Sequence, residues 1–342
     1  MRRHGEWPIS GVDLPMALTF VRPLRVARQA AERVAGVCCV APQGDRLLLL
    51  RSELDAQGLP TPVRQWAVRP FEPGQPELAL AALVREVKKP AQHRWSLLLP
   101  PSLCQLGSVE LPSLPSDDVK AALAWRLPEV FGSGGMGDVV SAQNTTFDVL
   151  PHPLNRPGAD QATYWVWAVA NASLQPWLLA FHGLKLPPPV VDCTDLAQRN
   201  LAARVAADGR AFALLSQGVE GFLLSIVQAG QLYLSRRFEA RSIDTERAFG
   251  GGSTQQLERI ALEVQRSLDM FDRKHGQVAV SRLLLAPQAT LSAAHELFRS
   301  NLYVPVELLP REAALTLPEG ADDVVCWGAL GALWRDSAWS GP

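Results

Sequence analysis

The order of β-rich and helical segments restricts the folds open to this chain of 342 residues. In the first half, β-rich runs at 36–41, 46–51 and 63–69 precede a helical pattern at 77–87. In the second half, three consecutive strand-like runs within 211–239 precede a long helical pattern at 254–274 and then alternating strands and helices. Two α/β halves are the architecture that this order predicts.

A small insertion is expected between the halves. Strand-like runs at 94–99 and 103–111 are followed by a helical pattern at 116–127 and a strand at 145–150. Ser116 is a suitable N-cap for that helix, since its side chain can accept a hydrogen bond from a free backbone N–H of the first turn. The order strand, strand, helix, strand predicts a self-contained subdomain.

These patterns give the following expected organisation. It comprises an N-terminal extension (1–35), the first part of a first lobe (36–90), an inserted small subdomain (91–150), the second part of the first lobe (163–207), a second lobe (208–320) and a C-terminal helix returning to the first lobe (321–342).

Composition excludes several classes of protein. The net charge of −1 argues against a dedicated nucleic-acid binder. The five cysteines form no C-x-x-C pair, so we expect reduced, buried thiols, and the six isolated histidines predict no metal site. The apolar runs fall far short of the about 20 residues that a membrane helix needs, so we expect no spanning segment.

Four segments together resemble the PilM family of type IV pilus assembly proteins, and most of all its relative MshI from mannose-sensitive (MSHA) pilus biogenesis. They are LLLPPSLCQLGSVELPSLPSDDVKAALAW at 97–125, GLKLPPPVVDCTDLAQRN at 183–200, ALEVQRSLDMF at 261–271 and GALGALW at 328–334. The resemblance implies an α/β, actin-like (ribonuclease H-like) two-lobed fold with an inserted small α+β subdomain.

Actin-like proteins bind ATP with Mg²⁺ between their lobes, but the corresponding motifs are altered here. A first phosphate hairpin similar to G-x-D-x-G would match Gly36, Cys38 and Val40; a second, similar to D-x-G-x-x-x-T, would match Ser216, Gly218 and Phe222; and the adenosine loop would contain Ala286 and Pro287. Cysteine and serine replace hard carboxylate ligands, and valine and phenylalanine take space that phosphate would need. We therefore expect a degenerate cleft with no cofactor and no enzymatic activity.

The resemblance also implies a partner. PilM-family proteins hold the cytoplasmic tail of a PilN-like inner-membrane protein beside the inserted subdomain. The expected partner-binding residues here are Trp95, Leu97, Leu103, Val119, Leu123, Trp125 and Arg126. The resemblance admits the assembly ATPase machinery as a further partner and implies a cytoplasmic adaptor, peripheral to the inner membrane.

Two other functions stay open at this point. One is an active actin-like ATPase of the PilM type, which would use ATP and Mg²⁺. The other is a cytoplasmic domain similar to the type II secretion protein GspL, a family that usually continues into a membrane helix.

Overall fold

The computed structural model describes residues 34–132, 140–205, 209–239, 252–310 and 317–335. The N-terminal extension expected at 1–35 lies outside them, apart from Val34 and Ala35. No helix in these described ranges is both long enough and apolar enough to cross a membrane.

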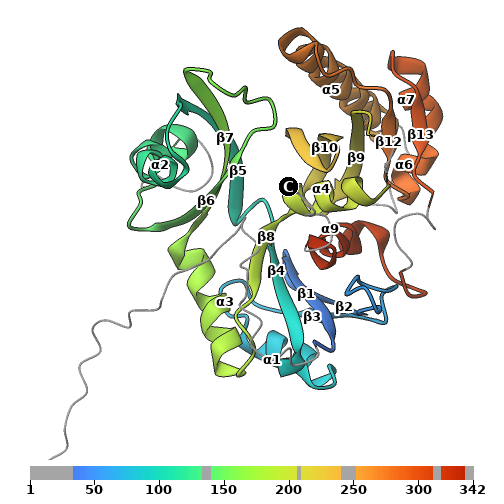
Figure 1. Ribbon diagram of the computed structural model, residues 1–342. Helices are drawn as coiled ribbons and strands as arrows, with labels where there is room; N and C mark the ends of the chain where they lie inside the picture. Colours follow the sequence, from blue (N-terminus) through green and yellow to red (C-terminus); the bar gives the residue numbers. More distant parts are fainter. Residues whose placement is uncertain (1–33, 133–139, 206–208, 240–251, 311–316, 336–342) are drawn as a thin grey trace, which may run out of the picture.

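Two five-stranded sheets share one strand order (Figure 1). The first contains β1 (Gly36–Gln43), β2 (Arg46–Glu53), β3 (Gln65–Pro70), β4 (His93–Leu99) and β8 (Val190–Cys193), in the order β3-β2-β1-β4-β8. The second contains β9 (Phe212–Gly218), β10 (Gly221–Gln228), β11 (Gln231–Phe238), β12 (Leu283–Leu285) and β13 (Val306–Leu308), in the order β11-β10-β9-β12-β13. In each, three antiparallel strands are extended by two parallel ones. We call the halves lobe I (34–99 and 171–193) and lobe II (209–310).

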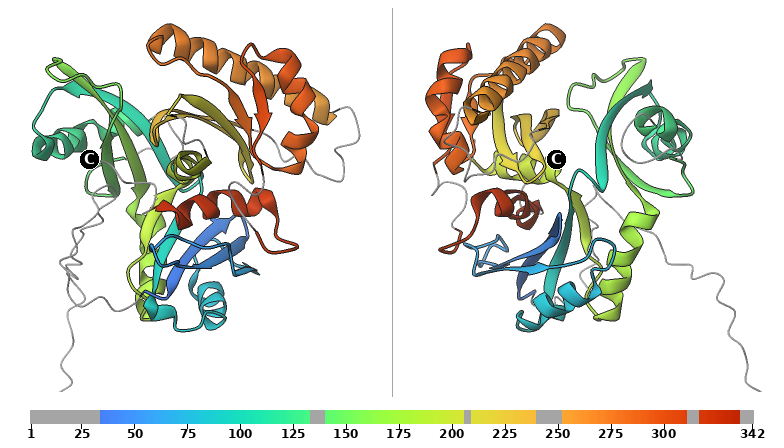
Figure 2. Two further views of the ribbon diagram at one scale, coloured as in Figure 1. Left: turned by 45° about the vertical axis from the view of Figure 1, so that its right-hand side comes forward. Right: turned by 180° about the vertical axis from the view of Figure 1, so that it is seen from behind.

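Helices cover the outer faces and fill the space between the sheets. Lobe I carries α1 (Glu77–Arg85), the short η1 (Pro90–Gln92) and α3 (Asn171–Gly183), and lobe II carries α5 (Gly252–His275), α6 (Ala289–Ala293) and α7 (His295–Asn301). Between the lobes lie α4 (Thr194–Val205) and α9 (Asp323–Leu333), which pack on each other (Figures 1 and 2). Because α9 contacts β1 and β2 as well as β9, it joins the two halves.

The helical pattern expected at 254–274 is confirmed by α5. Ile260, Ala261, Val264, Leu268 and Phe271 are all buried. The amphipathic face therefore supplies much of the core of lobe II, as its spacing predicts.

The small subdomain (104–170) differs in extent from the expected 91–150. Its sheet has the order β5-β7-β6, formed by β5 (Cys104–Pro112), β6 (Thr145–Pro151) and β7 (Gln161–Ala170), with α2 (Ser116–Phe131) on one face. The strand β4, expected in the insertion, instead pairs with β1 and β8 in lobe I. The strand β7, expected in lobe I, is the central strand of the small subdomain.

The physical reason for the second difference is that β7 is buried on both faces. Val166 and Ala168 pack in the cluster beneath α2, whereas Trp165, Trp167 and Val169 join the main core. A continuous apolar run is typical of a central strand in any sheet that is covered on both faces. The run alone therefore does not indicate which sheet the strand belongs to.

Candidate functional site

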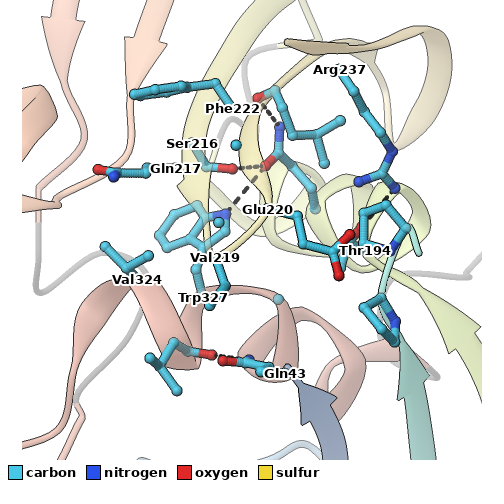
Figure 3. A pocket seen from close by; sticks show the side chains of 18 of the residues that line it. Gln43, Thr194, Ser216, Gln217, Val219, Glu220, Phe222, Arg237, Val324 and Trp327 are labelled. Carbon is cyan, nitrogen blue, oxygen red and sulfur yellow. Dashed lines mark hydrogen bonds between the residues drawn. The ribbon is translucent and has the colours of Figure 1, made fainter. Parts of the chain in front are cut away.

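A cleft of about 410 Å³ lies between the lobes (Figure 3). One wall is the end of β1 and the segment after β4, and the other is the turn between β9 and β10 with the end of β11. The floor comes from α4 and α9, through residues such as Thr194, Gln198 and Trp327. In an actin-like fold this is the position of the nucleotide cleft.

A buried amide closes the deep end of the cleft. Gln198 is fully buried, and its Nε2 lies 3.0 and 3.1 Å from the carbonyl oxygens of Leu214 and Leu223. Its Oε1 accepts hydrogen bonds from the hydroxyl of Ser216 and from Trp327 Nε1, the latter at 3.2 Å (Figure 3). The Ser216 hydroxyl therefore uses its one proton in a hydrogen bond to a buried side chain.

A carboxylate bridges the mouth of the cleft. Glu220, in the turn between β9 and β10, accepts hydrogen bonds from Ser102 Oγ at 2.7 Å and from the Ser102 backbone N–H at 3.0 Å. Ser102 belongs to the segment after β4, on the opposite wall. The bridge joins the two walls and places a negative charge on the turn that was matched to the second phosphate hairpin.

Arg237 is the one basic side chain among the described residues that line the cleft. It pairs with the buried carboxylate of Asp195 at the start of α4 and donates to Thr194 Oγ1 at 2.7 Å. Ser235 donates to the second carboxylate oxygen of Asp195 at 2.5 Å. The guanidinium thus neutralises an internal acid.

These residues do not fit a magnesium triphosphate. The acidic lining residues, Glu220 and Glu239, come with no lysine, and Arg237 already has its carboxylate partner. In the described parts of the chain, no three His, Cys, Asp or Glu side chains are grouped so that they could hold a metal ion by themselves. A triphosphate at this position would find no free cationic side chain among the described lining residues to offset its charge.

Only part of the predicted cleft set lines the cleft. Ser216, Gly218 and Phe222 do, at the end of β9 and the start of β10. Gly36, Cys38 and Val40 instead lie buried inside β1, which contributes its last three residues to the wall. Burial raises the pKa of the Cys38 thiol to about 12, so this side chain is neutral. The prediction that these three residues line the cleft is therefore wrong.

The expected adenosine loop is also closed. Ala286 and Pro287 are absent from the cleft lining, and the next residue, Gln288, is fully buried. Its Oε1 accepts from the backbone N–H of Gln217, and its Nε2 donates to the Gln217 carbonyl, both at 2.7 Å. The Gln288 side chain therefore holds this loop against β9. A glycine-rich adenosine loop would instead let the backbone approach a ligand closely.

Sequence reasoning missed the polar residues that shape the cleft. Those that line it are Gln43, Ser102, Thr194, Gln198, Glu220 and Arg237, and Gln288 is bonded to the lining residue Gln217. The one available signal was Glu220, since an acid two residues after Gly218 stands in the turn that the motif comparison had already located.

The seven predicted partner-binding residues do not form one surface. Trp95 and Leu97 are buried in β4 of lobe I, so the prediction that they contact a partner is wrong for this conformation. Val119 and Leu123 are buried too, because they form the face of α2 that packs on its own sheet. Leu103 is half-buried against the main core.

Trp125 and Arg126 do reach the surface of α2. The Trp125 side chain is 88% exposed, one of the most exposed large apolar side chains among the described residues. Arg126 pairs with Glu129 and donates to the Glu110 carbonyl at 2.7 Å, which fixes the helix to β5. An exposed tryptophan is the kind of side chain that dominates binding between protein chains.

No family model and no curated protein matches the sequence. Among solved structures, the chain is similar to the PilM–PilN type IV pilus biogenesis complex, at 19% identity and a TM-score of 0.60, over 87% of this chain and 98% of that one. It is also similar to the cytoplasmic domain of EpsL from the type II secretion system of Vibrio cholerae (15% identity, 90% and 96% covered, TM-score 0.46). A third similar structure is a Bacteroides thetaiotaomicron protein with an actin-like ATPase fold and unknown function (8% identity, 82% and 93% covered, TM-score 0.46). The predicted actin-like α/β fold is thereby confirmed.

Proposed function

We propose that this chain is a non-enzymatic adaptor of a type IV pilus assembly complex, with an interlobe cleft that does not use ATP. The observation that carries the proposal is the bridge from Glu220 to Ser102 across the cleft mouth. It puts a carboxylate on the turn that the resemblance matches to a phosphate hairpin. The fold similarity to a PilM–PilN complex supports the assembly role.

Nucleotide binding is tested by thermal unfolding of the full chain with and without Mg²⁺ and ATP. A ligand at 100 times its Kd would stabilise the folded state by about 2.7 kcal/mol, a rise of several degrees in melting temperature. We expect no saturable rise. A saturable rise with ATP, absent with Mg²⁺ alone, would instead support the active ATPase.

We propose that the partner is the cytoplasmic tail of a PilN-like inner-membrane protein and that it contacts the outer face of α2 at Trp125. A large apolar side chain in water gains free energy when a partner covers it, and tryptophan is enriched among residues that dominate binding. Through this partner the adaptor would be cytoplasmic and peripheral to the inner membrane. The four resembling segments favour the MSHA-like branch, represented by MshI.

The partner contact is tested with a synthetic tail peptide of the PilN-like protein from the same organism. Trp125→Asp should weaken binding by about 2 kcal/mol or more, roughly thirtyfold, because a charge would replace the apolar anchor. The matched control is Leu78→Asp on α1 of lobe I, where the side chain is 87% exposed. Equal affinity of both variants and the unchanged chain would place the tail elsewhere.

A further inference from the structure

The small subdomain meets lobe II at an irregular point of an edge strand. In β11, Leu234 pairs with Ile226 and Leu232 pairs with Val227, so Tyr233 is an extra residue without a cross-strand partner. This is a β-bulge, which twists a strand locally and re-aims its backbone groups. Because β11 is the last strand of its sheet, its outer edge is open to another element.

Two ring N–H groups of the small subdomain bind the bulge. Trp165 of β7 donates from Nε1 to the Leu232 carbonyl at 2.9 Å. His152, the residue after β6, lies with Nε2 3.1 Å from the Tyr233 carbonyl. In a regular strand neighbouring carbonyls point to opposite edges, so the bulge is what allows both to face the small subdomain.

The second nitrogen of His152 determines its protonation. The backbone N–H of Leu154 donates to Nδ1 at 3.3 Å, so Nδ1 must carry a lone pair. The proton of the neutral ring then sits on Nε2 and is donated to Tyr233. A second proton at Nδ1 would point at the Leu154 N–H and break this arrangement.

The surroundings also disfavour a charged ring. His152 is 7% exposed and lies against Trp165, with ring centroids 5.3 Å apart. The titratable and charged groups that face it are Tyr233 of β11 and Lys274 and His275 of α5, and the His275 ring centroid is 6.3 Å away. Burial lowers the pKa of His152, the hydrogen bond to the Tyr233 carbonyl opposes this in part, and His275 and Lys274 lower it further.

We propose that His152 is a proton-operated latch: the neutral ring holds the small subdomain on the bulge of β11, and protonation releases it. The latch is independent of the proposed function, since it concerns the contact between the small subdomain and lobe II alone.

The direction of the pH effect follows from linkage. The ordinary pKa of histidine is 6.5, and that of the docked ring is lower. When the pH is above both pKa values, His152 is neutral in the docked state and in the open state, and the docked state has its full stability. As the pH falls below the ordinary value, the open state binds a proton that the docked state does not, which favours opening about tenfold per pH unit. The effect ends once the pH is below the pKa of the docked ring.

Hydrogen exchange of the full chain, read by mass spectrometry between pH 7.5 and 5, tests the latch. Rates are corrected for the intrinsic pH dependence of amide exchange. We expect protection of β11 and of residues 152–154 to fall by about tenfold or more over this range. Protection of β2 and β4 in lobe I should stay constant, which distinguishes release from global unfolding.

Two variants complete the design. His152→Gln keeps a side-chain N–H for the Tyr233 carbonyl and cannot titrate, so its β11 should stay protected at pH 5. His275→Gln removes a group that lowers the pKa of the docked ring, so that pKa rises towards the ordinary value and β11 should lose less protection by pH 5 than in the unchanged chain. Constant β11 protection in the unchanged chain, or an equal loss in His152→Gln, would overturn the proposal. If His152→Gln is already open at pH 7.5, the comparison of His275→Gln with the unchanged chain decides, and an equal loss of β11 protection in the two overturns the proposal.

Discussion

Glu220 and Ser102, 118 residues apart in the chain, are joined by two hydrogen bonds from Ser102 to one carboxylate. Both residues line the interlobe cleft, Glu220 in the turn between β9 and β10 of lobe II and Ser102 in the segment after β4. The lobes therefore cannot separate at this point without breaking both bonds. A ligand that needed a wider opening would have to displace them.

Replacing Glu220 by alanine should loosen the cleft without unfolding the protein. Both residues are exposed, so the change in unfolding free energy should stay below about 1 kcal/mol. The Ser102 amide loses its acceptor and should exchange with solvent faster, as measured by hydrogen exchange. Glu239→Ala, a cleft carboxylate of the same charge with no bond to Ser102, should leave that amide unchanged. Equal exchange in both variants would contradict the bridge.

Replacing Gln198 should reduce the unfolding free energy far more than replacing Glu220. Leucine at this position keeps the volume but leaves the Ser216 hydroxyl and the Trp327 N–H buried without their acceptor. We expect a loss of about 2–4 kcal/mol in unfolding free energy, measured by urea denaturation. Gln228→Leu in β10 removes one exposed bond to the Gly209 carbonyl and should cost less than about 1 kcal/mol. Similar losses would show that the amide network does not stabilise the cleft.

The fold was predictable because its strongest signals are local. The face of α5 and the apolar strands β1, β2 and β9 follow from spacing and composition within single elements. Spacing and composition within one element did not predict which sheet β4 and β7 would join. Both are apolar runs buried on two sides, and their place depends on which distant strand supplies the hydrogen bonds.

The cleft was harder to predict than the fold. Motif matching located the hairpin at Ser216 and Gly218 but misplaced Gly36, Cys38 and Val40, because the wall begins only where β1 ends. Gln198 and Gln288 carry no motif. Their roles arise from carbonyl and amide groups that other strands bring to them, which a single sequence does not display.

The five cysteines should be unreactive in the folded protein. All are free and buried. Burial raises the pKa of Cys104 and of Cys326 to about 12, so almost no thiolate exists at pH 8. Mass spectrometry after iodoacetamide treatment should show no adduct in buffer and five adducts in denaturant. A folded chain with a modified thiol would contradict this burial.

The contact between α4 and α9 should be intolerant of a single added methyl group. A Cβ on Gly331 would lie 2.0 Å from the carbonyl oxygen of Ala197, which is backbone and cannot rotate away. Asn200 also donates to the Gly331 carbonyl at 3.1 Å, so a shift of α9 would break a buried hydrogen bond. We expect Gly331→Ala to reduce the unfolding free energy by about 3 kcal/mol, measured by urea denaturation.

Two other glycines serve as controls. A Cβ in Gly328→Ala would lie 3.0 Å from the flexible side chain of Leu98, so this variant should lose less unfolding free energy. Gly183→Ala, at the end of α3 with open space around it, should be neutral or stabilising by up to about 1 kcal/mol. If the three variants are equally stable, the close approach of α9 to α4 is absent from the folded protein.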